Sequence, residues 1–79
     1  MTEIAPGIEI DPERGHGKPL IRNSRVPVTR VLAAVAGGLS FQEVELEYGI
    51  TSDDIRAAIA FANQLVSEQS FVLTGSRGS

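Results

Sequence analysis

The stretch Ser40–Ala58, SFQEVELEYGITSDDIRAA, predicts two helices joined by a tight corner. Ser40 and Glu43 have the spacing of a capping box, in which each side chain bonds the backbone of the other residue at a helix start. Gly49 suits the left-handed conformation that commonly ends a helix. This pattern indicates a helix-turn-helix shape with Gly49 in the turn.

The apolar positions at which the two helices of such a motif cross are all suitably filled, by Val44, Tyr48, Ile50, Ile55 and Ala58. One position departs from the pattern, because Glu45 stands where a small residue is preferred. A helical hairpin with a glycine corner, lacking the DNA-binding role, therefore stays open as an alternative.

The flanking segments complete the expected fold. Residues 28–36 form a first short helix that the pair Gly37–Gly38 stops, and the third helix runs from a cap at Thr51 or Ser52 to about Ser67. An apolar stripe at helical spacing marks the third helix: Ile55, Ala58, Ile59, Ala62, Leu65 and Val66.

Short apolar runs at residues 8–10 and 19–21 predict strands of an N-terminal β-arm. We therefore expect an α+β, mostly α fold: a flexible N-terminus (1–7), a β-arm (8–27), a three-helix homeodomain-like region (28–67) and a tail (68–79). The final GSRGS resembles a remnant of an expression vector.

Charge is unevenly distributed along this chain of net charge −3. Residues 14–30 carry five bases and no acid, whereas residues 1–13 carry four acids and no base. Such a basic block can mark an anionic partner. The candidate DNA-binding residues are Lys18, Arg22, Arg25, Arg30, Ser52 and Arg56. Arg22 and Arg25 can equally hold acids of the protein itself, and Asp53 and Asp54, which favour the helix start, would repel phosphates.

No catalytic or metal-binding group can be assembled from the sequence. The chain has no cysteine, its one histidine, His16, has no second ligand at metal spacing, and Glu43 and Glu47 lack a third convergent group. We expect no enzyme activity, no cofactor and no metal. No segment has the length of apolar sequence that spans a membrane, which favours a cytoplasmic protein without a membrane partner.

Residues 17–28, GKPLIRNSRVPV, resemble the signature of the bacterial family known as domain of unknown function 433. The matching positions are Gly17, Lys18, Pro19, Ile21, Arg22, Arg25, Pro27, Val28, Gly38, Ser40, Glu43 and Tyr48. The family has Gly-Thr where this chain has Asn23-Ser24. Asparagine tolerates left-handed geometry best among the other residues, and a serine hydroxyl can bond the turn backbone.

The resemblance, which covers about residues 8–67, implies a homeodomain-like fold with a β-arm. Some family members are encoded beside PIN-like ribonuclease toxins, which implies a VapB-type antitoxin that masks such a toxin and binds its own operator DNA. The alternative is a homo-oligomeric assembly or adaptor module that does not bind DNA. The candidate interface residues are Ile8, Ile10, Leu20, Ile21, Leu46, Phe71, Val72 and Leu73.

We predict a homodimer or larger oligomer, because a chain of 79 residues without disulfides buries only about 60% of its unfolded surface. Pairing of arm strands across subunits would add the missing contacts. Sedimentation velocity at micromolar concentration checks this, and a single stable monomeric species would contradict it.

Overall fold

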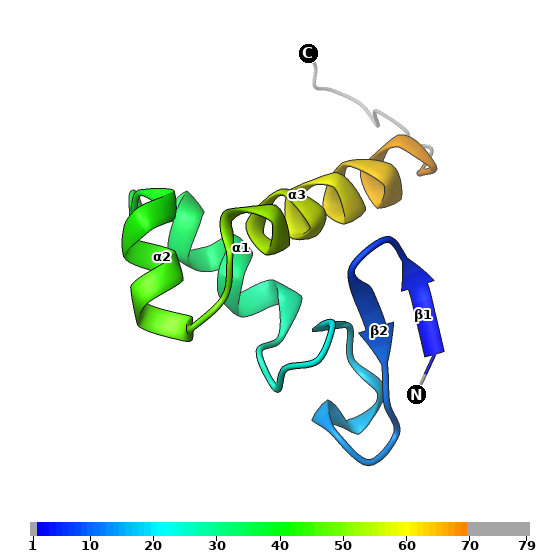
Figure 1. The fold of residues 1–79 in the computed structure, drawn as a ribbon. Helices are drawn as coiled ribbons and strands as arrows, with labels where there is room; N and C mark the ends of the chain where they lie inside the picture. Colours follow the sequence, from blue (N-terminus) through cyan, green and yellow to red (C-terminus); the bar gives the residue numbers. More distant parts are fainter. Residues whose placement is uncertain (1, 70–79) are drawn as a thin grey trace.

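The computed structural model describes residues 2–69, which form a small antiparallel sheet followed by three helices (Figure 1). The elements are β1 (Thr2–Ala5), β2 (Ile8–Ile10), the 3-10 turn η1 (Gly15–Gly17), β3 (Leu20–Ile21), α1 (Val28–Ala36), α2 (Phe41–Tyr48) and α3 (Ser52–Ser67). The expected α+β, mostly helical fold class is confirmed.

The three strands lie in the order β1-β2-β3, and both neighbouring pairs are antiparallel. Strand β1 was not predicted, because residues 2–5 lie in the segment expected to be flexible. The turn at residues 6–7 closes it onto β2, and the Gly7 amide donates a 2.9 Å hydrogen bond to the Glu3 carboxylate. The side chains of β1 are mostly exposed, so the strand leaves only a weak hydrophobic pattern in the sequence.

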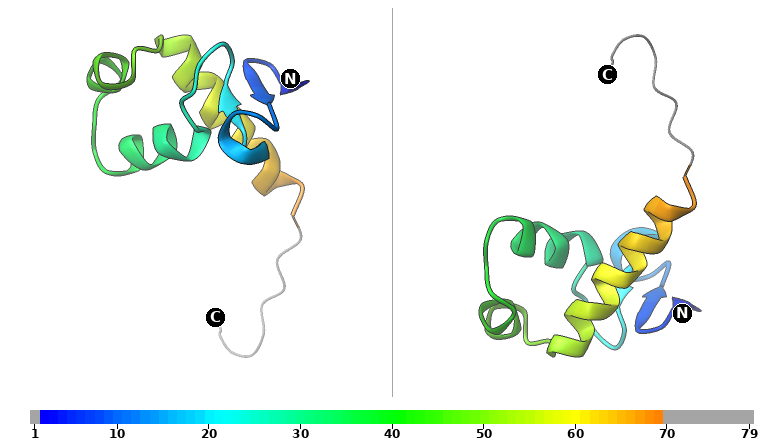
Figure 2. Two further views of the ribbon diagram at one scale, coloured as in Figure 1. Left: turned by 90° about the horizontal axis from the view of Figure 1, so that it is seen from below. Right: turned by 90° about the horizontal axis from the view of Figure 1, so that it is seen from above.

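The β1–β2 hairpin packs beside α3, as the two further views show (Figure 2). Gly7 makes this approach possible, because a Cβ atom at this position would lie 3.0 Å from the Ala57 Cβ. Its φ of +79° is also one that glycine adopts without steric cost. The hairpin turn therefore packs closely against one side of α3.

Side chains from the sheet and all three helices share one hydrophobic core: Ile8, Ile21, Val28, Val31, Val44, Ile50, Ile55 and Ala58. Leu20 is also buried. The prediction that Ile8, Leu20 and Ile21 form a subunit interface is therefore wrong, since their apolar side chains fill the core of the single chain. Ile10 is half-buried.

Local capping fixes the corner between α2 and α3. Ser40 and Glu43 form the predicted capping box, and Gly49 ends α2 in the left-handed conformation, with φ of 68°. Thr51 caps α3 and makes a second capping box with Asp54. The role of Asp54 is thus a specific hydrogen bond, at 2.9 Å from the Thr51 amide, in addition to the expected effect of its charge.

The predicted apolar stripe of α3 is buried only in its first half. Ile55 and Ala58 are in the core, whereas Ile59, Leu65 and Val66 are 38%, 46% and 59% exposed. The reason is length: α3 has 16 residues, and α1 and α2, with nine and eight, do not cover its last turns. Figure 1 shows this end of α3 extending beyond the other two helices.

We predict that Gly7→Ala lowers the free energy of unfolding by about 1–3 kcal/mol more than Gly17→Ala does. Both glycines have φ near +80°, but a Cβ at Gly17 meets no atom within 4 Å, so only the Gly7 variant presses against α3. Urea denaturation of both variants measures the difference. Equal losses would show that the hairpin does not bear on α3.

Candidate functional site

The basic segment, residues 14–30, carries the candidate binding residues, and the structure separates its cations by whether they have an acidic partner. Arg14 and Arg22 form ion pairs with carboxylates of the hairpin and its following loop. Arg25 and Arg30 form none within residues 2–69, and neither does the ammonium group of Lys18. The five charges of the segment therefore have different roles.

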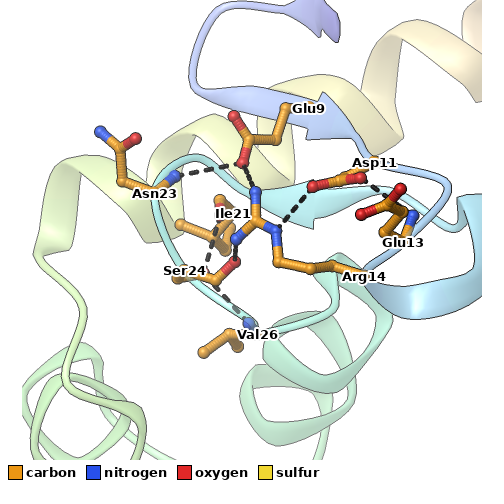
Figure 3. Close-up of polar contacts among 8 residues, drawn as sticks. All are labelled: Glu9, Asp11, Glu13, Arg14, Ile21, Asn23, Ser24 and Val26. Carbon is orange, nitrogen blue, oxygen red and sulfur yellow. Dashed lines mark hydrogen bonds and ion pairs between the residues drawn. The ribbon is translucent and has the colours of Figure 1, made fainter. Parts of the chain in front are cut away.

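Arg14 is the centre of a cluster of polar contacts between the hairpin and the turn before α1 (Figure 3). Its guanidinium donates to the Glu9 carboxylate, to the Asp11 carboxylate at 2.9 Å and to the Ser24 carbonyl. Glu9 is only 2% exposed and also accepts from the Asn23 amide at 3.4 Å. The cluster gives the buried Glu9 carboxylate a cation and hydrogen-bond donors. Neither Glu9 nor Arg14 was a candidate functional residue from the sequence.

The same contacts shift two pKa values. The Glu13 amide and then the Arg14 guanidinium donate to Asp11 and lower the pKa of its carboxyl group. The bonds to Asp11 and Glu9 raise the pKa of Arg14. Because the pKa of Asp11 is lower in the folded state, its stabilising contribution is present above its unfolded pKa and disappears as the pH falls through the folded value.

The turn at residues 23–24 has the geometry expected from its sequence. Asn23 adopts φ of 60°, as predicted for the residue that replaces the family glycine. The Ser24 hydroxyl donates to the Ile21 carbonyl at 2.7 Å and accepts from the Val26 amide at 3.0 Å. The turn that leads to Arg25 is therefore fixed on both sides.

Arg25 and Arg30 line one surface pocket of about 300 Å³, whose other walls are Val26, Pro27 and Tyr48. Arg25 follows the turn, Arg30 lies in the first turn of α1, and Tyr48 is the last residue of α2. We call this site the Arg25–Arg30 pocket. Both arginines were candidates from the sequence, but their place in one pocket with Tyr48 was not predicted.

Two other candidate cations, Arg22 and Arg56, are partly neutralised, whereas Lys18 has no acidic partner within residues 2–69. Arg22 lies 3.5 Å from Glu3, with both side chains about half exposed. Arg56 lies 3.0 Å from Asp53 on the same helix, 3.4 Å from the Ser52 hydroxyl, and 5.9 Å from the centre of the Phe41 ring. With Asp53 and Asp54 against the single base Arg56, the start of α3 carries no net positive charge.

Exposed apolar side chains lie on α2, where Leu46 was a candidate interface residue, and on α3. Leu46 is 82% exposed on α2, and the uncovered half of α3 presents Ile59, Leu65 and Val66. We call these last three residues the α3 stripe. Phe71, Val72 and Leu73 lie outside the described residues.

Within residues 2–69, no three His, Cys, Asp or Glu side chains converge as a metal site would require. None of the helices in this range is long and apolar enough to cross a membrane.

These features define a small, mostly helical module with a cationic pocket and an uncovered apolar helix face. The family profile described as protein of unknown function DUF433 matches residues 8–62, so the chain belongs to the DUF433 family. The family resemblance of its basic segment is thereby confirmed.

One relative is a Mycobacterium tuberculosis protein named as the candidate antitoxin VapB45. It is 40% identical over 52 residues, which make up 66% of this chain and 22% of that protein. The crystal structure of Rv2018 from the same organism matches with a TM-score of 0.62 and 40% identity, over 66% of this chain and 24% of that one. This chain thus spans about a quarter or less of the mycobacterial proteins.

A crystal structure of a DUF433 member from Anabaena variabilis matches with a TM-score of 0.69 and 32% identity. The match covers 78% of this chain and 62% of that one. Two solved structures therefore share the arrangement described here over most of the chain.

We predict that Arg14→Met destabilises the fold more than the double substitution Glu9→Gln plus Arg14→Met. The single variant leaves the Glu9 carboxylate buried without its cation, whereas the double variant removes the charge as well. Glu9→Gln alone should lower the free energy of unfolding by about 1–3 kcal/mol. Urea denaturation of the three variants forms a double-mutant cycle, and purely additive losses would contradict the coupling.

Proposed function

We propose that the chain is the antitoxin module of a toxin–antitoxin pair and that it binds and masks a PIN-like ribonuclease toxin. It acts by binding rather than by catalysis, in the cytoplasm, where such a toxin meets its RNA. The relationship to a candidate antitoxin supports the class. The kind of toxin is what the sequence resemblance implies, through family members encoded beside PIN-like ribonucleases. The observation that carries the proposal is the α3 stripe.

The α3 stripe has the form of a helix that docks in a groove. Two members of the stripe, Ile59 and Val66, are seven residues apart, and the small Ala62 lies between them on the same helix face, at the i, i+3, i+7 spacing of helices that bind in grooves. Leu65, the third member, precedes Val66 at the edge of this face. Neighbouring exposed apolar side chains on so small a domain mark an interaction surface. Burying the α3 stripe against a toxin would cover the part of the helix that the other elements of residues 2–69 leave exposed.

We further propose that the module binds operator DNA and so regulates its own operon. Lys18, Arg25 and Arg30 support this role, because they are exposed and have no acidic partner within residues 2–69. In this proposal the corner at Gly49 is a helix-turn-helix, and the basic segment supplies the phosphate contacts that the neutralised Arg56 does not.

The alternative function is a homo-oligomeric assembly or adaptor module that does not bind DNA. The pairing of Asp53 with Arg56 favours it, since this pair lies near the start of α3, where a recognition helix contacts base edges. In that case the basic segment would serve contacts between subunits.

We predict that the chain relieves growth arrest caused by the ribonuclease encoded beside it, and that Leu65→Glu plus Val66→Glu abolishes the rescue. Two carboxylates in a desolvated apolar interface are strongly unfavourable. Co-expression in a heterologous host gives the growth readout, and co-purification gives the binding readout.

Ala60→Glu plus Gln64→Glu is the matched control, because it adds two carboxylates to exposed positions of α3 outside the stripe. Circular dichroism confirms folding of each variant. If both double variants rescue growth equally, the α3 stripe does not bind the toxin. A neighbouring reading frame without ribonuclease activity, together with a homo-oligomer that ignores DNA, would favour the adaptor function.

A further inference from the structure

We propose that the Arg25–Arg30 pocket binds a phosphate group of a nucleic-acid backbone. This inference rests on the proposed binding of operator DNA and names the residues that carry it. It also moves the contact away from the start of α3, where a helix-turn-helix protein would ordinarily place it.

Charge pairing singles out this pocket among the arginines of residues 2–69, and Lys18, which also has no acidic partner there, does not line it. Arg14, Arg22 and Arg56 each have a carboxylate partner within residues 2–69, and the two arginines that have none line the same pocket. Two guanidinium groups on one pocket raise each other's electrostatic energy, and an anion between them removes that repulsion. The pocket is therefore complementary to a single anionic group.

The chemistry of the walls favours a phosphodiester over an isolated carboxylate. A guanidinium pairs with two oxygens of a phosphate or of a carboxylate equally well, so the distinction comes from the other walls of the pocket. Val26 and Pro27 offer apolar surface to the sugar beside the phosphate, and the Tyr48 ring offers a face on which a base or sugar can lie. A carboxylate side chain would leave much of this apolar wall without a partner.

The backbone around the pocket holds the two arginines in place before any ligand arrives. The turn at Asn23–Ser24 fixes the approach to Arg25, Pro27 has a restricted φ, and Arg30 belongs to a regular helix. Pre-organisation of this kind lowers the entropy lost on binding.

The surrounding charge limits how many phosphates the site accepts. Helix α2 contributes Tyr48 to the pocket and also carries Glu43, Glu45 and Glu47. These carboxylates would repel further phosphates beside the pocket. We expect contact with one or two phosphates per chain, and a correspondingly shallow dependence of the affinity on salt.

Tyr48 supplies a probe of its own pocket, because it is the only tyrosine and the chain has no tryptophan. Titration with sodium tripolyphosphate, which does not absorb where tyrosine is excited, should change the Tyr48 emission. Poly-glutamate is the carboxylate comparison. Anisotropy of labelled promoter duplex, scrambled duplex and single-stranded RNA then measures nucleic-acid binding at several salt concentrations.

The test variant is Arg25→Ala plus Arg30→Ala, and the charge-matched control is Arg22→Ala plus Arg56→Ala. Neither arginine of the test variant has a partner within the described part of the chain, so this variant should fold. We expect it to lose the tripolyphosphate response, to bind nucleic acid about tenfold more weakly for each arginine removed, and to lower the salt slope by about one to two. The control should keep the fluorescence response and most of the affinity.

Three outcomes would overturn the inference: a Tyr48 response to poly-glutamate but not to tripolyphosphate, unchanged nucleic-acid binding by the test variant, or a loss confined to the control. The last would return the contact to α3. If promoter, scrambled duplex and RNA bind equally well and all depend on Arg25 and Arg30, the pocket stands and the operator role fails. Loss of toxin masking by the α3-stripe variant does not affect either result.

Discussion

The buried carboxylate of Glu9 is the constraint on which the arrangement of the molecule depends. A charge in the interior is tolerated only with a cation and hydrogen-bond donors around it, and Arg14 and the Asn23 amide supply them. Arg14 also bonds the Ser24 carbonyl, so one side chain ties β2 to the turn that precedes α1. The direction in which Arg25 leaves that turn, and hence the shape of the cationic pocket, follows from a contact that lies outside the pocket.

The predictions that succeeded rest on interactions between residues close in sequence. The capping box of α2 spans three residues, Gly49 acts through its own backbone angle, and Asn23 replaces a glycine by a residue that accepts the same geometry. Each pattern has one low-energy local conformation, and tertiary packing does not change it. The approximate ends of the helices could be predicted for the same reason.

The errors concern contacts between distant parts of the chain. The sequence presents Arg14 as one more cation of a basic block, and only the folded loop reveals its carboxylate partners. Ile8 and Ile21 look equally suited to an interface and to a core, because period and hydropathy are the same in both. Likewise, Leu65 and Val66 continue a correct helical stripe, but nothing local says that α1 and α2 end before they can cover it. The sequence predicted Arg25 and Arg30 as binding residues, but it did not predict that they line the same pocket.

The uncovered end of α3 has a consequence for the dynamics of the free protein. Among residues 2–69 its last turns are exposed, so backbone hydrogen bonds there should open at a small fraction of the free energy of global unfolding and exchange their amide hydrogens early. A partner that binds this end would suppress the opening, and the entropy lost in ordering the helix would lower the affinity. In the unbound protein, the opened end of the helix is accessible to proteolysis. The lifetime of the unbound chain would then be set by how often this end of α3 opens, independently of the strength of the core.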